Sequence, residues 1–104
     1  MTQRILPDAL DDARSTAARL EREHAGYGLA FSALFDTAAD RCRDTPRLFS
    51  PTDDGPDGME TREVFLARFN QRVIYAVTDA EVVILAVVHA HSRPGAWVGR
   101  VEQV

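Results

Sequence analysis

The chain has 104 residues, of which 45% are hydrophobic and 27% are charged, a composition typical of one globular domain and not of a disordered segment. The net charge of −4 is uneven, because residues 1–57 carry seven arginines against eleven acids, whereas residues 58–104 carry five of each. A broad nucleic-acid-binding surface needs clustered positive charge, so the acidic first half argues against that class of protein.

Residue types that are missing or rare exclude several further possibilities. All twelve basic residues are arginine, which stays protonated in proteins, so no lysine can act as a nucleophile or a base. Cys42 is the single cysteine, so no internal disulfide can form, and a cytoplasmic location is expected. The N-terminal stretch lacks a hydrophobic signal core, and the longest apolar run, Val82–Val88, is too short for a membrane span. We therefore expect neither export nor membrane anchoring.

The first half of the chain predicts a helical hairpin. Thr2–Leu6 is extended, and Pro7 suits the first position of a helix, where its missing N–H is not needed. The Gly-Tyr-Gly break at residues 26–28 ends this helix and allows the chain to reverse into a second helix over Leu29–Arg43. Helical spacing predicts apolar faces made of Leu10, Ala13, Ala17, Leu20 and His24 on the first helix, and of Phe31, Leu34, Phe35, Ala38 and Cys42 on the second.

The second half predicts a β-meander after a long connection. Asp44–Gly58 contains three prolines and two glycines, and we expect Thr52–Gly58 to be its disordered tip. Three strands follow, over Thr61–Arg68, Gln71–Val77 and Glu81–His89, and the gaps between them have the length and polarity of hairpin turns. An antiparallel meander packed against the helical hairpin is an α+β arrangement of two layers, formed by a single domain over residues 1–104.

The third strand is apolar on both faces, so it should lie inside the sheet with cover on each side. The helices cover one face; the Trp97 segment could cover part of the other, and another chain could supply the rest. Trp97 is interpreted as a plug over the open face or as an interface anchor, two roles that are compatible. Tyr75, in the middle strand, is expected in the core with its hydroxyl hydrogen-bonded.

The order of features from the second strand onward resembles the C-terminal half of the RelE/ParE family of bacterial toxins from type II toxin–antitoxin pairs. These features are an Arg-x-x-Tyr strand (Arg72–Tyr75), an Asp-containing turn (Thr78–Asp79), a Val/Ile-rich strand (Val82–Val88) that ends at His89, and the segment Arg93–Trp97. The resemblance implies the same α+β fold, with the extended N-terminal segment as a short edge strand. It also implies a hetero-oligomer with a cognate antitoxin, whose C-terminal segment wraps across the helical hairpin and the sheet.

Metal-independent cleavage of mRNA on the ribosome is one activity that the family suggests. Such cleavage needs a base, an acid and cations that face the phosphate, which His89, His91, Arg72 and Arg93 would supply. The interpretation that we favour is structural, with the histidine capping a strand end and the arginines solvating an edge or binding a partner's acids. A metal site begun by His89 and His91 would lack further ligands, so we expect no metal and no cofactor.

The family's ribosome-dependent endonucleases usually place basic residues on the strand before the Arg-x-x-Tyr strand, where this chain has Glu63 and Phe65. The chain therefore looks closer to the ParE branch, whose members act on DNA gyrase, a mechanism that needs a binding surface and no catalytic set. Two alternatives stay open: the mRNA endonuclease, and a non-toxic binding module of the same fold, which the acidic charge favours because toxins that pair with acidic antitoxins tend to be basic. The candidate partner contacts are Arg62, Arg68, Arg72, Arg93 and Trp97.

Overall fold

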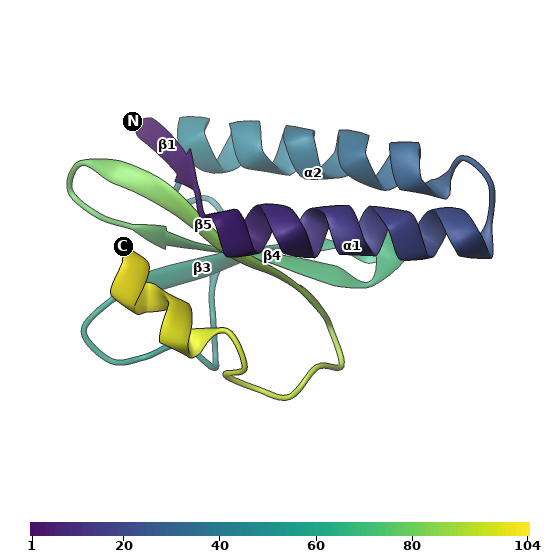
Figure 1. Ribbon diagram of the computed structural model, residues 1–104. Coiled ribbons are helices and arrows are strands. Elements are labelled where there is room, and N and C mark those ends of the chain that lie inside the picture. Colours follow the sequence, from purple (N-terminus) through teal and green to yellow (C-terminus); the bar gives the residue numbers. More distant parts are fainter.

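The chain folds into two main layers, with a helical hairpin on one face of a five-stranded sheet (Figure 1). The computed structural model describes residues 1–104. The helices are α1 (Pro7–Glu23) and α2 (Tyr27–Asp44). The strands are β1 (Thr2–Ile5), β2 (Ser50–Pro51), β3 (Glu60–Leu66), β4 (Gln71–Val77) and β5 (Glu81–His89), and two short 3-10 helices are η1 (Ala67–Phe69) and η2 (Val98–Gln103).

The sheet has the strand order β1-β5-β4-β3-β2. Strands β2 to β5 are antiparallel neighbours, whereas β1 runs parallel to β5 and pairs Thr2–Ile5 with Glu81–Ile84. A parallel pair needs a long connection, and the helical hairpin with the strands that follow it provides one. The predicted α+β fold is confirmed: a helical hairpin lies on an antiparallel meander that carries a short N-terminal edge strand.

The turn between the helices is built by a side chain of α1. The Glu21 carboxylate accepts hydrogen bonds from the backbone N–H groups of Gly26 and Gly28, each at 3.0 Å, and so caps the N-terminus of α2. Gly26 has φ of +92°, a conformation that glycine adopts without steric cost. The glycines in the sequence suggest that α2 begins at Leu29. Because Glu21 caps the N–H groups of Gly26 and Gly28, the helix begins at Tyr27 instead.

The core lies between the helices and the sheet. On α1, Ala13 and Leu20 are buried as predicted, but Ala9 is also fully buried, and His24 is exposed and stacks on Tyr27. The difference arises because α1 follows β1 with no loop, so its first turn lies against the sheet while its last turn projects beyond it (Figure 1). On α2 the buried members of the predicted face are Phe31, Phe35, Ala38 and Cys42.

Strand β3 is shorter than predicted. It ends at Leu66, because Ala67–Phe69 form a 3-10 turn and Asn70 takes the left-handed conformation, at φ of +56°, that reverses the chain into β4. Asparagine enters this conformation more readily than most residues. The composition of residues 66–68 does not distinguish a strand end from a tight turn, which is why the sequence predicts a strand to Arg68.

Strand β5 is buried on both faces by the chain itself. Val82–Ala86 have no exposed surface. The helices cover one face of the sheet, and the C-terminal segment with η2 lies on the other (Figure 1). Trp97 of this segment belongs to the hydrophobic core. The expectation that the Trp97 segment covers the open face is confirmed. The burial of this strand is complete without the second chain that the sequence left open as a source of further cover.

The open edge of β5 is sealed by an ion pair. Because β1 pairs only as far as Ile84, the β5 backbone beyond that point has a neighbouring strand, β4, on one side only. The Val87 N–H donates to the Asp12 carboxylate at 3.0 Å, and the Leu85 carbonyl oxygen accepts from the Arg100 guanidinium at 3.0 Å. Asp12 and Arg100 also pair with each other at 2.6 Å. These two side chains take the place of a strand at an edge that would otherwise be free to pair with another chain.

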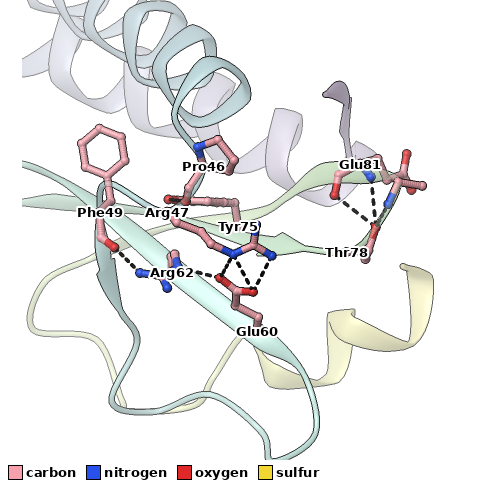
Figure 2. Close-up of polar contacts among 9 residues, drawn as sticks. Pro46, Arg47, Phe49, Glu60, Arg62, Tyr75, Thr78 and Glu81 are labelled. Carbon is pink, nitrogen blue, oxygen red and sulfur yellow. Dashed lines mark hydrogen bonds and ion pairs between the residues drawn. The ribbon is translucent and has the colours of Figure 1, made fainter.

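Tyr75 of β4 is fully buried, and its hydroxyl donates a hydrogen bond of 2.6 Å to the Pro46 carbonyl oxygen (Figure 2). The bond ties the end of α2 to the sheet, and burial raises the pKa of the Tyr75 hydroxyl. The prediction of a core tyrosine with a bonded hydroxyl is confirmed.

Candidate functional site

A polar cleft of about 310 Å³ lies on the face of the sheet opposite the helices. Tyr75 points toward the helical layer, since its hydroxyl reaches Pro46 in the segment that directly follows α2, so the alternation of side chains along β4 turns Arg72 away from the helices. Arg72 forms part of the cleft wall. The complete lining is Asp53, Asp54, Glu63, Arg72, Ala90, Ser92 and Pro94.

The Arg72 guanidinium is held between two carboxylates. Its Nη1 and Nη2 atoms donate to Asp54 at 3.1 and 2.7 Å, and its Nε and Nη2 atoms donate to Glu63 at 2.8 and 3.2 Å. The three side chains are 15%, 11% and 21% exposed, respectively. Hydrogen bonds to Asp54 and then to Glu63 raise the pKa of Arg72. Because two carboxylates surround one guanidinium, the cleft offers no free positive charge to a phosphate.

Asp54 joins three parts of the chain at this cleft. Besides pairing with Arg72, its Oδ2 atom accepts hydrogen bonds from the Gly95 backbone N–H at 2.9 Å and from the Trp97 indole N–H at 3.0 Å. The hydrogen bonds from Arg72, followed by those from Gly95 and Trp97, hold the pKa of Asp54 well below its usual range despite partial burial. Asp54 therefore stays ionised and connects its own loop to β4 and to the C-terminal segment.

The expectation that Thr52–Gly58 forms a disordered tip is wrong. Asp54 anchors this loop to the sheet, and the Thr52 and Thr61 hydroxyls form a hydrogen bond of 2.6 Å. The composition of the loop is that of a solvated turn, and Arg72 lies 18 residues further along the chain. One signal was present in the sequence, because an arginine in an otherwise apolar strand needs an acid beside it. The sequence does not indicate which acid.

Trp97 is 2% exposed, and Asp54 satisfies its indole N–H. The ring closes this side of the sheet next to Gly55, where an added Cβ would lie 3.5 Å from the indole. The interpretation of Trp97 as a plug is confirmed. In this conformation the buried ring presents no surface to a partner.

His89, His91 and Arg93 are exposed at the end of β5, and the residues that alternate with them line the cleft instead. The His91 backbone N–H donates to His89 Nδ1 at 3.1 Å, and the two imidazole centroids lie 5.4 Å apart. None of the three side chains has an acid partner. The structure thus brings the two histidines together but leaves them outside the cleft that holds Arg72.

Arg62 is engaged within the chain, whereas Arg68 is not. The Nε atom of Arg62 donates to Glu60 at 2.8 Å, and its Nη1 atom donates to the Phe49 carbonyl oxygen at 2.7 Å (Figure 2). Arg47 holds the same carboxylate at 3.0 Å, and hydrogen bonds from Arg62 and then from Arg47 lower the pKa of Glu60. Arg68, in η1, is exposed and pairs with no acid. Of the five candidate partner contacts, Arg68 and Arg93 are exposed and unpaired, Arg62 and Arg72 are paired with acids, and Trp97 is buried.

An apolar groove of about 310 Å³ lies between α1 and α2. It is lined by Leu10, Ala13, Arg14, Ala17, Phe31, Ser32, Phe35 and Asp36. The groove is open because the alanines contributed by α1 are too small to fill the space beside the phenylalanines of α2. Arg14 and Asp36 line it as well, and neither forms an ion pair, so the groove combines apolar surface with two unpaired charges.

No group of three or more histidine, cysteine or acidic side chains is placed so that it would hold a metal ion. Neither helix combines the length and the apolar character needed to cross a membrane. In comparisons with known proteins, no family model and no curated protein matches this sequence. The function is therefore inferred from the geometry of the chain and from the resemblance of its C-terminal half.

Proposed function

We propose that this chain is the toxin component of a type II toxin–antitoxin pair, most like ParE, which inhibits growth by binding DNA gyrase and is neutralised by a cognate antitoxin. The order of features from Arg72 to Trp97, which resembles the RelE/ParE family, supports the proposal. The α+β fold in which these features occur is the fold that the resemblance implies.

The observation that carries the choice of binding over cleavage is the double pairing of Arg72. A cation that stabilises the transition state of RNA cleavage must face the phosphate without competing anions. Here the guanidinium makes four hydrogen bonds to Asp54 and Glu63, and a third carboxylate, Asp53, lines the same cleft. An entering phosphate would meet a negatively charged wall. A toxin that acts by binding a partner protein does not need that cation.

The apolar groove between α1 and α2 supports the antitoxin part of the proposal. Its volume is about 310 Å³, and five of its eight lining residues are hydrophobic. The resemblance implies that the antitoxin's C-terminal segment crosses the helical hairpin, and an amphipathic segment binds such a groove by inserting apolar side chains. Arg14 and Asp36, both unpaired, would then contact polar side chains on the flanks of that segment.

Each alternative depends on one observation. The interpretation of the chain as an mRNA endonuclease rests on the side chains of His89, His91 and Arg93, which are exposed and have no acid partner. The non-toxic binding module depends on the net charge of −4, which is opposite in sign to that of family toxins that pair with acidic antitoxins.

Inducible expression of this chain alone in bacteria tests all three functions. Rates of DNA synthesis and of protein synthesis are measured after induction, beside a His89→Ala, His91→Ala double variant, which changes only exposed side chains. The proposal predicts that DNA synthesis stops first, that the double variant has the same effect, and that purified chain inhibits supercoiling by gyrase. Early failure of protein synthesis that the double variant relieves would establish the endonuclease. Normal growth while the folded protein is confirmed to be present would exclude both toxic activities and favour the non-toxic binding module.

A further inference from the structure

Arg68 is a cation held in place by aromatic rings and left without an acid. Its guanidinium carbon lies 4.9 Å from the centroid of Phe69 and 5.5 Å from the centroid of Tyr27. Tyr27 meets Phe69 edge-on at 5.6 Å and stacks on His24 at 4.3 Å. The rings attract the guanidinium and restrict its orientation. Its N–H groups donate to no protein acceptor and therefore face solvent.

No acid lies within ion-pair distance of Arg68. Neither residues 64–78 nor residues 82–101 include an aspartate or a glutamate. These two stretches meet beside Arg68, because the Ala90 N–H donates to the Asn70 carbonyl oxygen at 2.9 Å and Gln71 pairs with His89. The segment that begins there carries the exposed bases His89, His91 and Arg93. At this end of the sheet Arg68, His89, His91 and Arg93 form no ion pair, and the acids Asp53, Asp54 and Glu63 lie in the cleft beside Ala90 and Ser92.

Most other arginines of the chain are already neutralised. Arg41 is the useful comparison, because it is exposed and also lies over an aromatic ring, at 4.8 Å from the centroid of Phe49. Arg41, however, has Asp40 and Asp44 close to it in the chain, whereas Arg68 has no such neighbour. Seven arginines form ion pairs, namely Arg4, Arg19, Arg43, Arg47, Arg62, Arg72 and Arg100.

We propose that Arg68, seated on Tyr27 and Phe69, binds a carboxylate of an acidic peptide segment in a partner protein. A planar guanidinium recognises a carboxylate through two parallel N–H···O bonds. Ordering a free arginine side chain on binding costs conformational entropy, and the two rings reduce that cost in advance. Arg93 adds long-range attraction for further acids of the same segment, and the imidazoles of His89 and His91 can donate hydrogen bonds to them.

A peptide suits this surface better than RNA does. Single-stranded RNA binds where aromatic faces are free to stack on bases and where cations follow the phosphate backbone. Here Tyr27 is already in contact with His24, Phe69 and Arg68. The inference stands apart from the proposed toxin activity, because an antitoxin, gyrase or any other acidic partner could use this site.

Binding of a fluorescently labelled hexaglutamate peptide, followed by anisotropy at low ionic strength, tests the inference, with hexaglutamine as the uncharged reference. Arg68→Gln is expected to weaken hexaglutamate binding about tenfold, the effect of removing a charge-assisted pair. Arg41→Gln, which removes the same charge from another exposed arginine over a ring, should change affinity less than about twofold. Tyr27→Leu, which keeps Arg68 but removes part of its support, should give an intermediate affinity. Fluorescence of the single tryptophan, Trp97, verifies that each variant is folded.

Three results would overturn the inference. Absence of hexaglutamate binding by the folded wild-type chain would show that there is no carboxylate site. Equal losses of hexaglutamate affinity in Arg68→Gln and Arg41→Gln would show that binding depends only on net charge and not on a site at Arg68. Tighter binding of a uridine oligonucleotide of equal charge, with the same dependence on Arg68, would assign the surface to nucleic acid.

Discussion

Replacing Asp54 by alanine is expected to lower the free energy of unfolding by about 3 kcal/mol, a sum of two losses. The buried Trp97 indole N–H would lose its acceptor, which costs about 1–3 kcal/mol. Arg72 would keep Glu63, so losing the second carboxylate should cost about 1–2 kcal/mol, less than the ~3–5 kcal/mol for a buried charge that loses its sole partner. The Gly95 N–H is only half-buried and can turn to water.

Urea denaturation followed by the fluorescence of the single tryptophan, Trp97, measures this loss. Asp53→Ala is the matched control, because Asp53 is the adjacent residue, exposed and without a hydrogen-bond partner, and its removal should change the free energy by less than about 0.5 kcal/mol. Asp54→Asn keeps an oxygen for the indole but loses the charge, so about half of the loss is expected. If Asp54→Ala were no more destabilising than Asp53→Ala, the role given to Asp54 would be refuted.

The contribution of Asp54 should also depend on pH in the acid range. Its pKa is lower in the folded chain than in the unfolded chain, so the unfolded state takes up a proton first as the pH falls. The contribution is therefore complete above the unfolded-state value of about 4 and is lost progressively below it. The difference in unfolding free energy between wild type and Asp54→Asn should be constant near neutral pH and shrink in acid. A difference that persisted unchanged in acid would contradict the ionised pair.

Three further changes test other parts of the structure. Asp12→Ala removes the acceptor at the open edge of β5 and should cost about 2 kcal/mol in urea denaturation, whereas the exposed Asp11→Ala should cost less than about 0.5 kcal/mol; equal losses would refute the edge seal. Gly28→Ala should lower the melting temperature although alanine favours helices, because the new Cβ would lie 2.8 Å from the Ala17 carbonyl oxygen; a higher melting temperature would count against this packing. Burial raises the pKa of the Cys42 thiol to about 12, so mass spectrometry should detect no alkylation at about pH 8 until the chain unfolds, and labelling of native protein would disagree with the buried thiol.

The secondary structure of this protein was determined largely by local sequence patterns. Pro7 begins α1 as predicted, and β4 and β5 have the predicted bounds, Gln71–Val77 and Glu81–His89. Helix periodicity, strand composition and hairpin-sized gaps act between residues that are close in the chain, so the sequence alone reveals them. The errors, at the start of α2 and the end of β3, fall where a capping side chain or a 3-10 turn decides the boundary.

Only part of the candidate site could be predicted from the sequence. Arg72 was a candidate from the Arg-x-x-Tyr strand, but its neutralisation depends on the pairing of β3 with β4. In that register Phe65 lies opposite Arg72, which places Glu63 on the same face and beside it. A shift of one residue would move the Glu63 side chain to the other face of the sheet. Asp54 reaches the guanidinium from a loop, and no local pattern specifies that contact.

What the sequence determined by itself was therefore the two helices, β1, β3, β4 and β5, their order, and the need to cover β5 on both faces, whereas β2, η1 and η2 were not predicted. Only the tertiary structure decided that the chain supplies this cover, that Asp12 and Arg100 seal the strand edge, and that Arg68 alone among the arginines lies on two rings without an acid. The physical reason is the range of the forces involved. Periodicity and turn chemistry act within a few residues, whereas the partner of each charge is set by which distant segments the fold brings together.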